Sequence, residues 1–212
     1  MKLEELEARL ERMEAILEIQ NLQSRYNFYL AMYWGEKVAD ELYLKNDPDI
    51  SADIGDKFFG MESIKRCFSQ LDLVHKSQPG RMGSIMALEP LIYVGKDRKT
   101  ARGQWWGLGF CSLPIKDGPG DQEKIEAVWM FGKYDNDYAL ENGQWKFKKI
   151  GFYTHFLSPY RLGWVNCPEP FSVRTFEAEE GSRPDIAKTS SPFRYNPEGP
   201  NSYGPPPPDP LE

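Results

Sequence analysis

Histidines and cysteines are the side chains of this 212-residue sequence that could bind a metal, and they are few and far apart. The chain has two histidines and three cysteines, at Cys67, His75, Cys111, His155 and Cys167. A structural zinc site or an iron–sulfur cluster needs closely spaced Cys or His ligands, and no such spacing occurs. The scattered cysteines also give no disulfide framework. We therefore expect neither a metal nor a cofactor.

His155 is the histidine whose surroundings suggest acid–base chemistry. It lies near the end of a predicted strand, and two-residue alternation puts it on the face of Trp145 and Phe147, which we expect to face a pocket or the core. As the only strand histidine it could move a proton. A structural role among aromatic neighbours is the alternative. His75, in a polar Lys-Ser-Gln context, is interpreted as a solvated loop residue.

Aromatic side chains make up 14% of the sequence, with six Trp, eleven Tyr and twelve Phe. Planar rings in a cavity would stack on an aromatic substrate. The candidates for substrate binding are Tyr29, Tyr33, Phe59, Trp105, Trp129 and Tyr153, with Tyr26 beside them. The alternative is that the rings fill the core. Three glycines on the predicted face of Trp105 either leave room for a cavity or mark a bend in the sheet: Gly103, Gly107 and Gly109.

The charge balance argues against nucleic acid and anionic lipid as partners. The chain carries 26 basic and 32 acidic residues, a net charge of -6, whereas both partners demand clustered positive charge. No apolar stretch approaches the roughly 20 residues of a membrane helix. The start of the chain is acidic and amphipathic, unlike a signal peptide. We therefore expect a cytoplasmic protein without a membrane partner.

The first predicted helix carries a narrow apolar seam on one side. Its residues recur at alternating steps of three and four: Leu3, Leu6, Leu10, Met13 and Leu17. Charged residues fill the intervening positions, so this N-terminal seam needs a partner surface. We expect a homodimer or higher homo-oligomer, formed through the seam and a sheet face. From Ile19 to about Trp34 the apolar face widens, and the helix joins the core there.

The remaining pattern predicts helices first and then antiparallel strands. Short helices are expected at 38–44 and 60–73, and strands at 85–94, 100–112, 124–134, 138–140 and 145–156. Pro90 indicates an edge position or a bulge, and Asn142-Gly143 is a hairpin signal. This order is typical of an α+β fold in which helices pack on the concave face of a curved sheet.

The C-terminal segment 166–212 differs in composition from the predicted domain at 19–165 and the helical extension at 1–18. Eleven of the 17 prolines lie in 168–212, which favours polyproline II or an irregular path. A solvated tail is one interpretation. Docking on its own domain or on a neighbour is the other, because aromatic residues are interspersed: Phe171, Phe176, Phe193, Tyr195 and Tyr203.

Four short motifs, in order and spacing, resemble a known family. They read IQNLQSRY at 19–26, FGMESI at 59–64, ARGQW at 101–105 and NGQWKF at 142–147. Residues 15–157 thereby resemble the SnoaL-like branch of the nuclear transport factor 2-like superfamily. The resemblance implies a cone-shaped α+β barrel with a deep apolar pocket at its wide end. Members include cofactor-independent dehydratases, ketosteroid isomerases, polyketide cyclases, dehydrochlorinases and formaldehyde-releasing lyases, as well as plain binding domains.

Departures from the family pattern affect the expected catalytic residues. Dehydratases of this family pair an Asp late in the first helix with a His before the first long strand; Ala31 and the segment 80–84 stand there instead. Arg81 would place a cation at the pocket mouth, where it could stabilise an oxyanion. Tyr26 matches a first-helix tyrosine of several dehydratases, and a nearby cation would favour its phenolate. The alternatives are a core tyrosine and a surface arginine.

These features together predict a cofactor-independent lyase acting on an aromatic or polycyclic small molecule. The reaction would be elimination or retro-aldol cleavage, with loss of water or formaldehyde. Arg81 would stabilise negative charge, and Tyr26 or His155 would move the proton. A ketosteroid-type isomerase is the second interpretation and needs an inward carboxylate, for which Glu126 is the candidate, since Asp135 has the opposite parity. A non-catalytic small-molecule binding domain is the third.

Overall fold

The computed structural model describes residues 2–77, 79–115, 122, 124–168, 184–187 and 189–209, with the side chains of 73–75, 77 and 191 excepted. Helices come first along the chain, as predicted. The helical elements are α1 (Leu3–Ala31), α2 (Gly35–Lys37), the π-helical turn η1 (Val38–Leu42), α3 (Gly60–Ser77), α4 (Gly163–Asn166) and the 3-10 turn η2 (Ser191–Phe193). The strands are β1 (Ser51–Asp53), β2 (Lys57–Phe59), β3 (Met82–Val94), β4 (Thr100–Ile115), β5 (Lys124–Glu141) and β6 (Gln144–Pro159).

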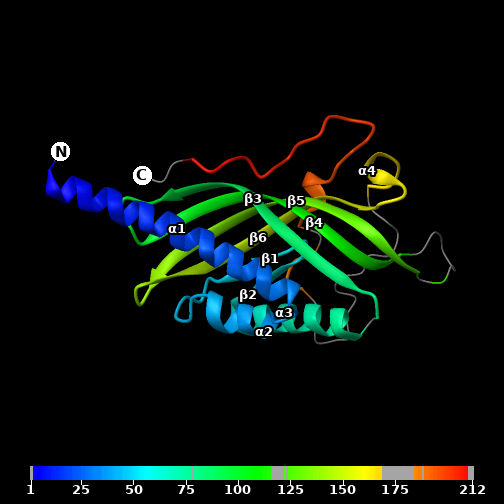
Figure 1. Cartoon of the computed structure of the whole chain (residues 1–212), viewed down its shortest axis with the longest axis horizontal. Helices are drawn as coiled ribbons and strands as arrows, with labels where there is room; N and C mark the ends of the chain where they lie inside the picture. Colours follow the sequence, from blue (N-terminus) through cyan, green and yellow to red (C-terminus); the bar gives the residue numbers. More distant parts are fainter. Residues whose placement is uncertain are drawn as a thin grey trace.

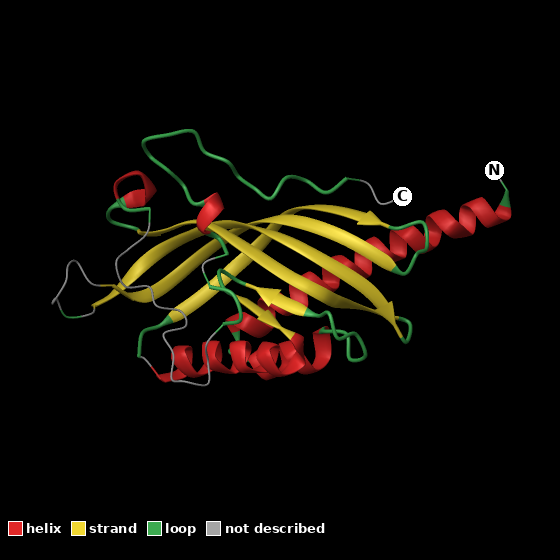
Figure 2. Ribbon diagram, turned by 180° about the vertical axis from the view of Figure 1, so that it is seen from behind, coloured by secondary structure: helices red, strands yellow, loops and turns green. Residues whose placement is uncertain are grey.

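The strands form a single curved sheet in the order β2-β1-β6-β5-β4-β3. Strands β3 to β6 make an antiparallel meander, and β1 pairs parallel with β6. Helices α1 and α3 lie on the concave side of the sheet (Figures 1 and 2). The predicted α+β cone is confirmed, although the sheet stays open rather than closing as a barrel. The strands expected at 124–134 and 138–140 are one strand, and His75 lies in α3 rather than in a loop.

Two local backbone features follow the sequence closely. Asn142 and Gly143 have φ of 52° and 76°, the left-handed pair that a two-residue hairpin between β5 and β6 requires. On edge strand β3, the pairing with β4 shifts between Leu88 and Leu91, next to Pro90. Proline has no backbone N–H to donate to a neighbouring strand. The bulge therefore lies where the sheet loses the fewest hydrogen bonds.

Aromatic rings fill the inner, concave face of the sheet. Tyr26 of α1 lies at the centre, with ring centroids 6.2 Å from Phe68, 6.1 Å from Tyr134 and 5.8 Å from Phe147. Trp105 is buried beside Tyr138, with centroids 6.1 Å apart. These edge-to-face pairs add to the burial energy of the rings.

Glycines on the inner face make space for rings. A Cβ on Gly103 would lie 2.7 Å from the indole of Trp105, and one on Gly132 would lie 2.9 Å from the ring of Phe152. A Cβ on Gly107 would also overlap the Phe152 ring. The space that these glycines leave is therefore occupied by Trp105 and Phe152.

Two bulges in β6 decide which side chains face inward. Between Phe147 and Lys149 the register with β5 shifts by one residue, so Lys148 is the extra residue and the alternation reverses beyond it. A second shift makes His155 the extra residue opposite Phe131 and Gly132. The prediction that His155 shares the face of Trp145 and Phe147 is therefore wrong, and its imidazole lies on the outer, convex face.

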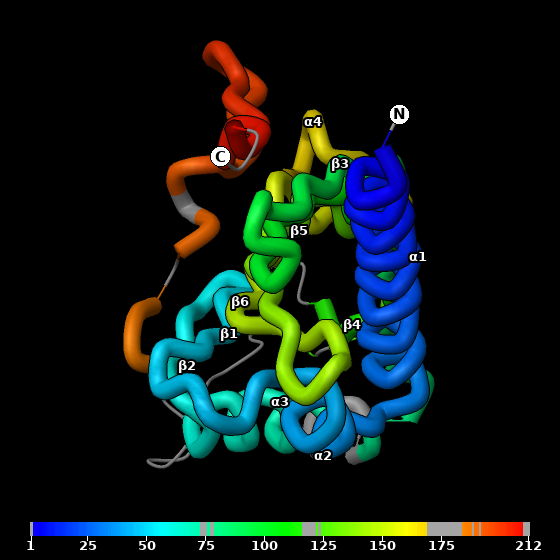
Figure 3. Tube along the Cα trace, turned by 90° about the vertical axis from the view of Figure 1, so that its left-hand side faces the viewer, coloured from blue at the N-terminus to red at the C-terminus, as the bar shows by residue number. Residues whose placement is uncertain are grey.

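The C-terminal tail docks on the outer face of its own sheet. Figure 3 shows it on the side of the sheet opposite α1. The amide of Tyr195 donates to the His155 carbonyl at 2.7 Å, Lys133 Nζ donates to the Pro205 carbonyl at 3.0 Å, and Gln104 Nε2 to that of Pro206 at 2.9 Å. Residues 184–209 therefore follow the docked interpretation where they are described, whereas Phe171 and Phe176 lie outside the described residues. None of the described helices has the length and apolar character to cross a membrane.

Candidate functional site

A cation and a carboxylate lie near Leu113 of β4. The β4–β5 register places Leu113 opposite Glu126, and Arg81 immediately precedes β3, whose first pair with β4 is Met82 opposite Ser112. The charge of Arg81 acts on the Cys111 thiol of the inner face, so Arg81 lies near this side of the sheet. We call Arg81, Leu113 and Glu126 the inner rim. Arg81 precedes β3 and Glu126 lies in β5, so two strand spacings, about 10 Å, separate their backbones.

An apolar cluster lies behind the inner rim, separate from the main core. Its buried members are Cys111, Leu113, Ile115, Val128 and Leu157. Burial raises the pKa of the Cys111 thiol to about 11, against the lowering effects of a Ser84 backbone hydrogen bond and of the Arg81 charge. This thiol is therefore protonated at neutral pH, and the cluster acts as an apolar wall.

Glu126 is a carboxylate that β5 directs to the inner face. Asp135 and Asp137 of the same strand face outward, as their opposite parity requires. One carboxylate oxygen of Glu126 accepts a hydrogen bond from Arg161 Nε at 2.8 Å, and the side chain is 17% exposed. A carboxylate in this position can accept a proton from a bound molecule.

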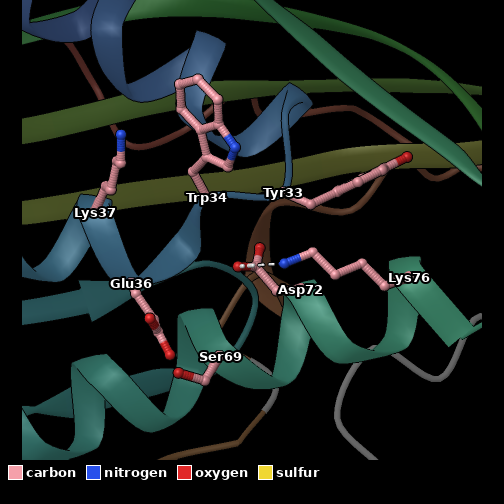
Figure 4. Close-up of a pocket in the computed structure, with 7 residues that line it drawn as sticks. All are labelled: Tyr33, Trp34, Glu36, Lys37, Ser69, Asp72 and Lys76. Carbon is pink, nitrogen blue, oxygen red and sulfur yellow. Dashed lines mark ion pairs between the residues drawn. The ribbon is translucent and has the colours of Figure 1, made fainter.

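A cleft of about 360 Å³ adjoins the rim between the end of α1, α2 and α3. Its lining residues, drawn in Figure 4, are Tyr33, Trp34, Glu36, Lys37, Ser69, Asp72 and Lys76. Tyr33 has a φ of 57°, and its hydroxyl donates to the Arg81 carbonyl at 3.3 Å. Figure 4 shows its ring extending away from the Asp72–Lys76 ion pair. Tyr33 therefore joins the cleft to the inner rim.

The carboxylate in the cleft has a structural task. Asp72 accepts the buried amide of Gly35 at 2.7 Å and lies 3.7 Å from Lys76 Nζ. Burial raises its pKa, although the Gly35 hydrogen bond and the Lys76 charge lower it. Asp72 thus ties the start of α2 to α3. Sequence reasoning did not find it, and the only signal was the i,i+4 spacing of Asp72 and Lys76.

A family model described as a SnoaL-like domain matches residues 11–150, which confirms the resemblance. The chain belongs to the SnoaL-like domain family. No match is found among curated proteins.

Solved structures share the SnoaL-like fold at low sequence identity. A protein from Novosphingobium aromaticivorans, provisionally named a scytalone dehydratase, is 18% identical with a TM-score of 0.56, covering 71% of this chain and 90% of its own. LinA is 13% identical, with a TM-score of 0.56 and coverage of 72% and 93%. Hexachlorocyclohexane dehydrochlorinase LinA type 2 is 17% identical, with a TM-score of 0.53 and coverage of 82% and 99%. At these identities the likeness establishes the fold.

Tyr26 lies deep in the core of the SnoaL-like domain. It is 1% exposed, and burial raises its pKa well above the usual tyrosine value, with further increases from Tyr134, Tyr43 and Cys67. A tyrosine that acts as a phenolate base needs a lowered pKa, so the raised pKa of Tyr26 is opposite to the expectation. The surroundings of Tyr26 are those of a core tyrosine.

His155 anchors the tail on the outer face. Its Nδ1 lies 2.9 Å from the Phe193 carbonyl, an acceptor, so Nδ1 carries the proton. Nε2 is buried and makes no hydrogen bond to any described residue. The imidazole contacts the rings of Trp106, Phe131 and Tyr203. Burial lowers the pKa of His155, so the ring is neutral at pH 7.

The remaining predicted binding residues do not share a cavity with Arg81. Trp129 packs between Phe110 and Tyr160 on the outer face. Tyr153, also outside, contacts Phe193 and donates to Asp53 at 3.4 Å.

Two further aromatic candidates stand at the periphery of the domain. Phe59 is 45% exposed under Lys57. Tyr29 contacts Trp34 and donates to Glu41 at 2.6 Å. Of the predicted site residues, the structure therefore brings together Arg81 and Tyr33.

Proposed function

We propose that this SnoaL-like protein is a cofactor-independent lyase for an aromatic or polycyclic small molecule, bound at the inner rim. The observation that carries the proposal is that Arg81 and Glu126 lie near Leu113 at this side of the sheet. A cation and a carboxylate whose backbones are about 10 Å apart, two strand spacings, can contact opposite ends of a single ring system. The apolar wall between them would exclude water and strengthen both charges.

The chemistry assigned to the rim is proton removal coupled to loss of a small fragment. In elimination, Glu126 takes a proton from carbon, the C–H electron pair forms the double bond, and hydroxide leaves and is protonated to water. In retro-aldol cleavage, Glu126 takes the hydroxyl proton, the C–C bond breaks, and formaldehyde departs. The electron pair then moves to a carbonyl or ring oxygen. Arg81 stabilises the negative charge on that oxygen in the cleavage, and the charge on the departing hydroxyl oxygen in the elimination.

Tyr33 is the phenol that contacts Arg81 in this scheme. Its hydroxyl is held at the Arg81 carbonyl, and its ring lines the adjoining cleft. A phenol hydroxyl there can donate to the leaving group. Tyr26 and His155 are assigned supporting roles, the first in the core and the second in tail docking. LinA type 2, by its name a dehydrochlorinase, supports an elimination on this fold.

The inward position of Glu126 also favours a second function, a ketosteroid-type isomerase. Isomerisation shares the first step, proton abstraction next to a carbonyl with the charge on oxygen stabilised by Arg81. It differs in returning the proton to another carbon instead of expelling a fragment. The mass of the product therefore separates the two functions.

The test is incubation of the purified protein, without added cofactor, with hydroxylated diaryl, steroid and phenylpropanoid compounds. Mass spectrometry would detect loss of water or formaldehyde, and proton NMR would detect isomerisation at constant mass. We expect turnover that Arg81→Ala and Glu126→Gln both suppress. Binding without any turnover across the panel would instead identify a non-catalytic binding domain.

A further inference from the structure

The N-terminal seam is exposed in the folded chain. Fractional exposures are 71% for Leu3, 49% for Leu6, 54% for Leu10, 62% for Met13 and 59% for Leu17. Figures 1 and 2 show this part of α1 extending beyond the sheet. Five large apolar side chains on one helix side are more than the scattered exposed residues of an ordinary surface. The seam is therefore a surface for a partner.

The seam points away from the body of the domain. The residues of α1 that pack against the core are Ala15, Ile19, Leu22 and Tyr26. At about 100° per residue, they centre on the opposite side of the helix from the seam. Phe28, 71% exposed, lies on the seam side three turns beyond Leu17. A second helix can therefore lie along the seam without displacing the sheet.

The N-terminal part of α1 is also held in place by the domain. Glu11 forms an ion pair with Arg98, in the turn between β3 and β4. Because this contact and the packing of Ala15 fix the helix, its first turns need no partner in order to be aligned. The seam is preformed, which lowers the entropic cost of association.

Charges beside the seam select the partner and its direction. With Leu3, Leu10 and Leu17 at heptad position a and Leu6 and Met13 at d, the g positions hold Lys2 and Arg9 and the e positions Glu7 and Glu14. In a parallel pair of identical helices, g faces the e position five residues later in the other chain. Lys2 then meets Glu7, and Arg9 meets Glu14. An antiparallel pair places like charges together instead.

We propose that residues 2–17 form a parallel, in-register, two-stranded coiled coil with a second copy of this chain. The seam supplies the apolar contact, and four interchain ion pairs fix the register. This assignment does not depend on the proposed catalytic function. It joins two domains through their α1 helices and leaves both inner rims accessible.

The first test is the mass of the full chain by sedimentation equilibrium over a range of concentrations. We expect a monomer–dimer equilibrium. Leu10→Glu should raise the dissociation constant of the dimer by at least about 100-fold, because two leucine side chains lose their burial. Arg12→Glu, on the same helix but away from the seam, is the matched control and should remain dimeric. Because Leu10 is exposed, thermal melting should show that the variant remains folded.

The second test asks whether the two paired helices run parallel or antiparallel. Met13→Cys places two d-position thiols opposite each other only in a parallel pair, so mild oxidation should give a covalent dimer. The wild-type chain, in which Cys67 and Cys111 are buried and Cys167 is partly exposed, is the control for the native thiols. A wild-type chain that stays monomeric at about 100 μM, well above a micromolar Kd, would overturn the proposal. So would a dimer that survives Leu10→Glu, or a Met13→Cys dimer without cross-linking.

Discussion

Arg81 and Glu126 flank one apolar cluster: Glu126 lies opposite Leu113, and the charge of Arg81 acts on the Cys111 thiol. Glu126 is also paired with Arg161, with Nε and a carboxylate oxygen 2.8 Å apart. With one charge on each side of the cluster, the two can act on different parts of a bound molecule.

Replacement of Arg81 by alanine should lower kcat/KM about 100- to 1000-fold, because the developing negative charge loses its stabilising cation. Thermal stability should change little in comparison. Arg98→Ala, which removes an exposed arginine far from the rim, is the matched control for charge. Steady-state kinetics and melting curves of both variants provide the measurement. An equal loss of activity and stability in Arg81→Ala would mean a structural arginine.

Glu126→Gln should lower kcat by about 100-fold or more, since the amide cannot accept a proton. Substrate binding, followed by fluorescence quenching, should persist because size and shape are unchanged. Asp137→Asn makes the same chemical change on the same strand but on the outer face. Activity in Glu126→Gln close to that of Asp137→Asn would remove Glu126 from the mechanism.

Gly107→Ala should destabilise the fold by about 1–3 kcal/mol, because the added methyl overlaps the ring of Phe152. Urea unfolding measures the change. In the Gly107→Ala/Phe152→Leu double variant the smaller side chain should relieve the overlap and recover part of the loss. Stability within about 0.5 kcal/mol of wild type, the range of a neutral surface change, would show that the space beside Gly107 is empty.

Acidification should loosen the tail through His155. Burial lowers the pKa of this imidazole, and the charges of Lys133 and Arg194 act in the same direction. The undocked state therefore binds a proton more readily, so this contribution to stability is present above about pH 6.5 and is lost as the pH falls toward the folded pKa.

The measurement for His155 is limited proteolysis of the tail and urea unfolding between about pH 7.5 and 5, a range that spans the ordinary histidine pKa. His155→Asn cannot titrate, so its pH dependence should be smaller than that of the wild type by the histidine contribution. Both proteins have the same carboxylates, so the pH dependence that the carboxylates cause cancels when the two pH profiles are compared. Identical pH profiles would show that His155 does not titrate with tail docking.

Sequence alternation predicted the faces of β4 but not those of β6. In β4 every inward residue from Ala101 to Gly109 follows two-residue spacing, and the structure agrees. In β6 the single extra residue Lys148 reverses the pattern, and no local propensity marks it, because a bulge depends on how the partner strand pairs. The orientation of His155 could therefore not be derived from the sequence.

The residues of the candidate site also divide into those that the sequence predicts and those that it does not. The choice of Arg81 rests on the family resemblance, and the parity of Glu126 follows from two-residue spacing along its strand. The depth of Tyr26 and the cleft at Tyr33 depend on how α1, α2 and α3 pack together, which periodicity does not specify. Docking of the tail requires complementarity between segments far apart in sequence, such as Lys133 and Pro205.

The docked tail also affects how this surface meets other proteins. Residues Pro205 to Pro208 carry carbonyl oxygens but no amide hydrogens, so they accept hydrogen bonds from Lys133 and Gln104 and donate none through their backbone. An extended segment that cannot donate cannot template a further β-strand. The outermost layer of this face thus resists the strand-to-strand stacking by which extended chains aggregate, while keeping the aromatic surface beneath it covered.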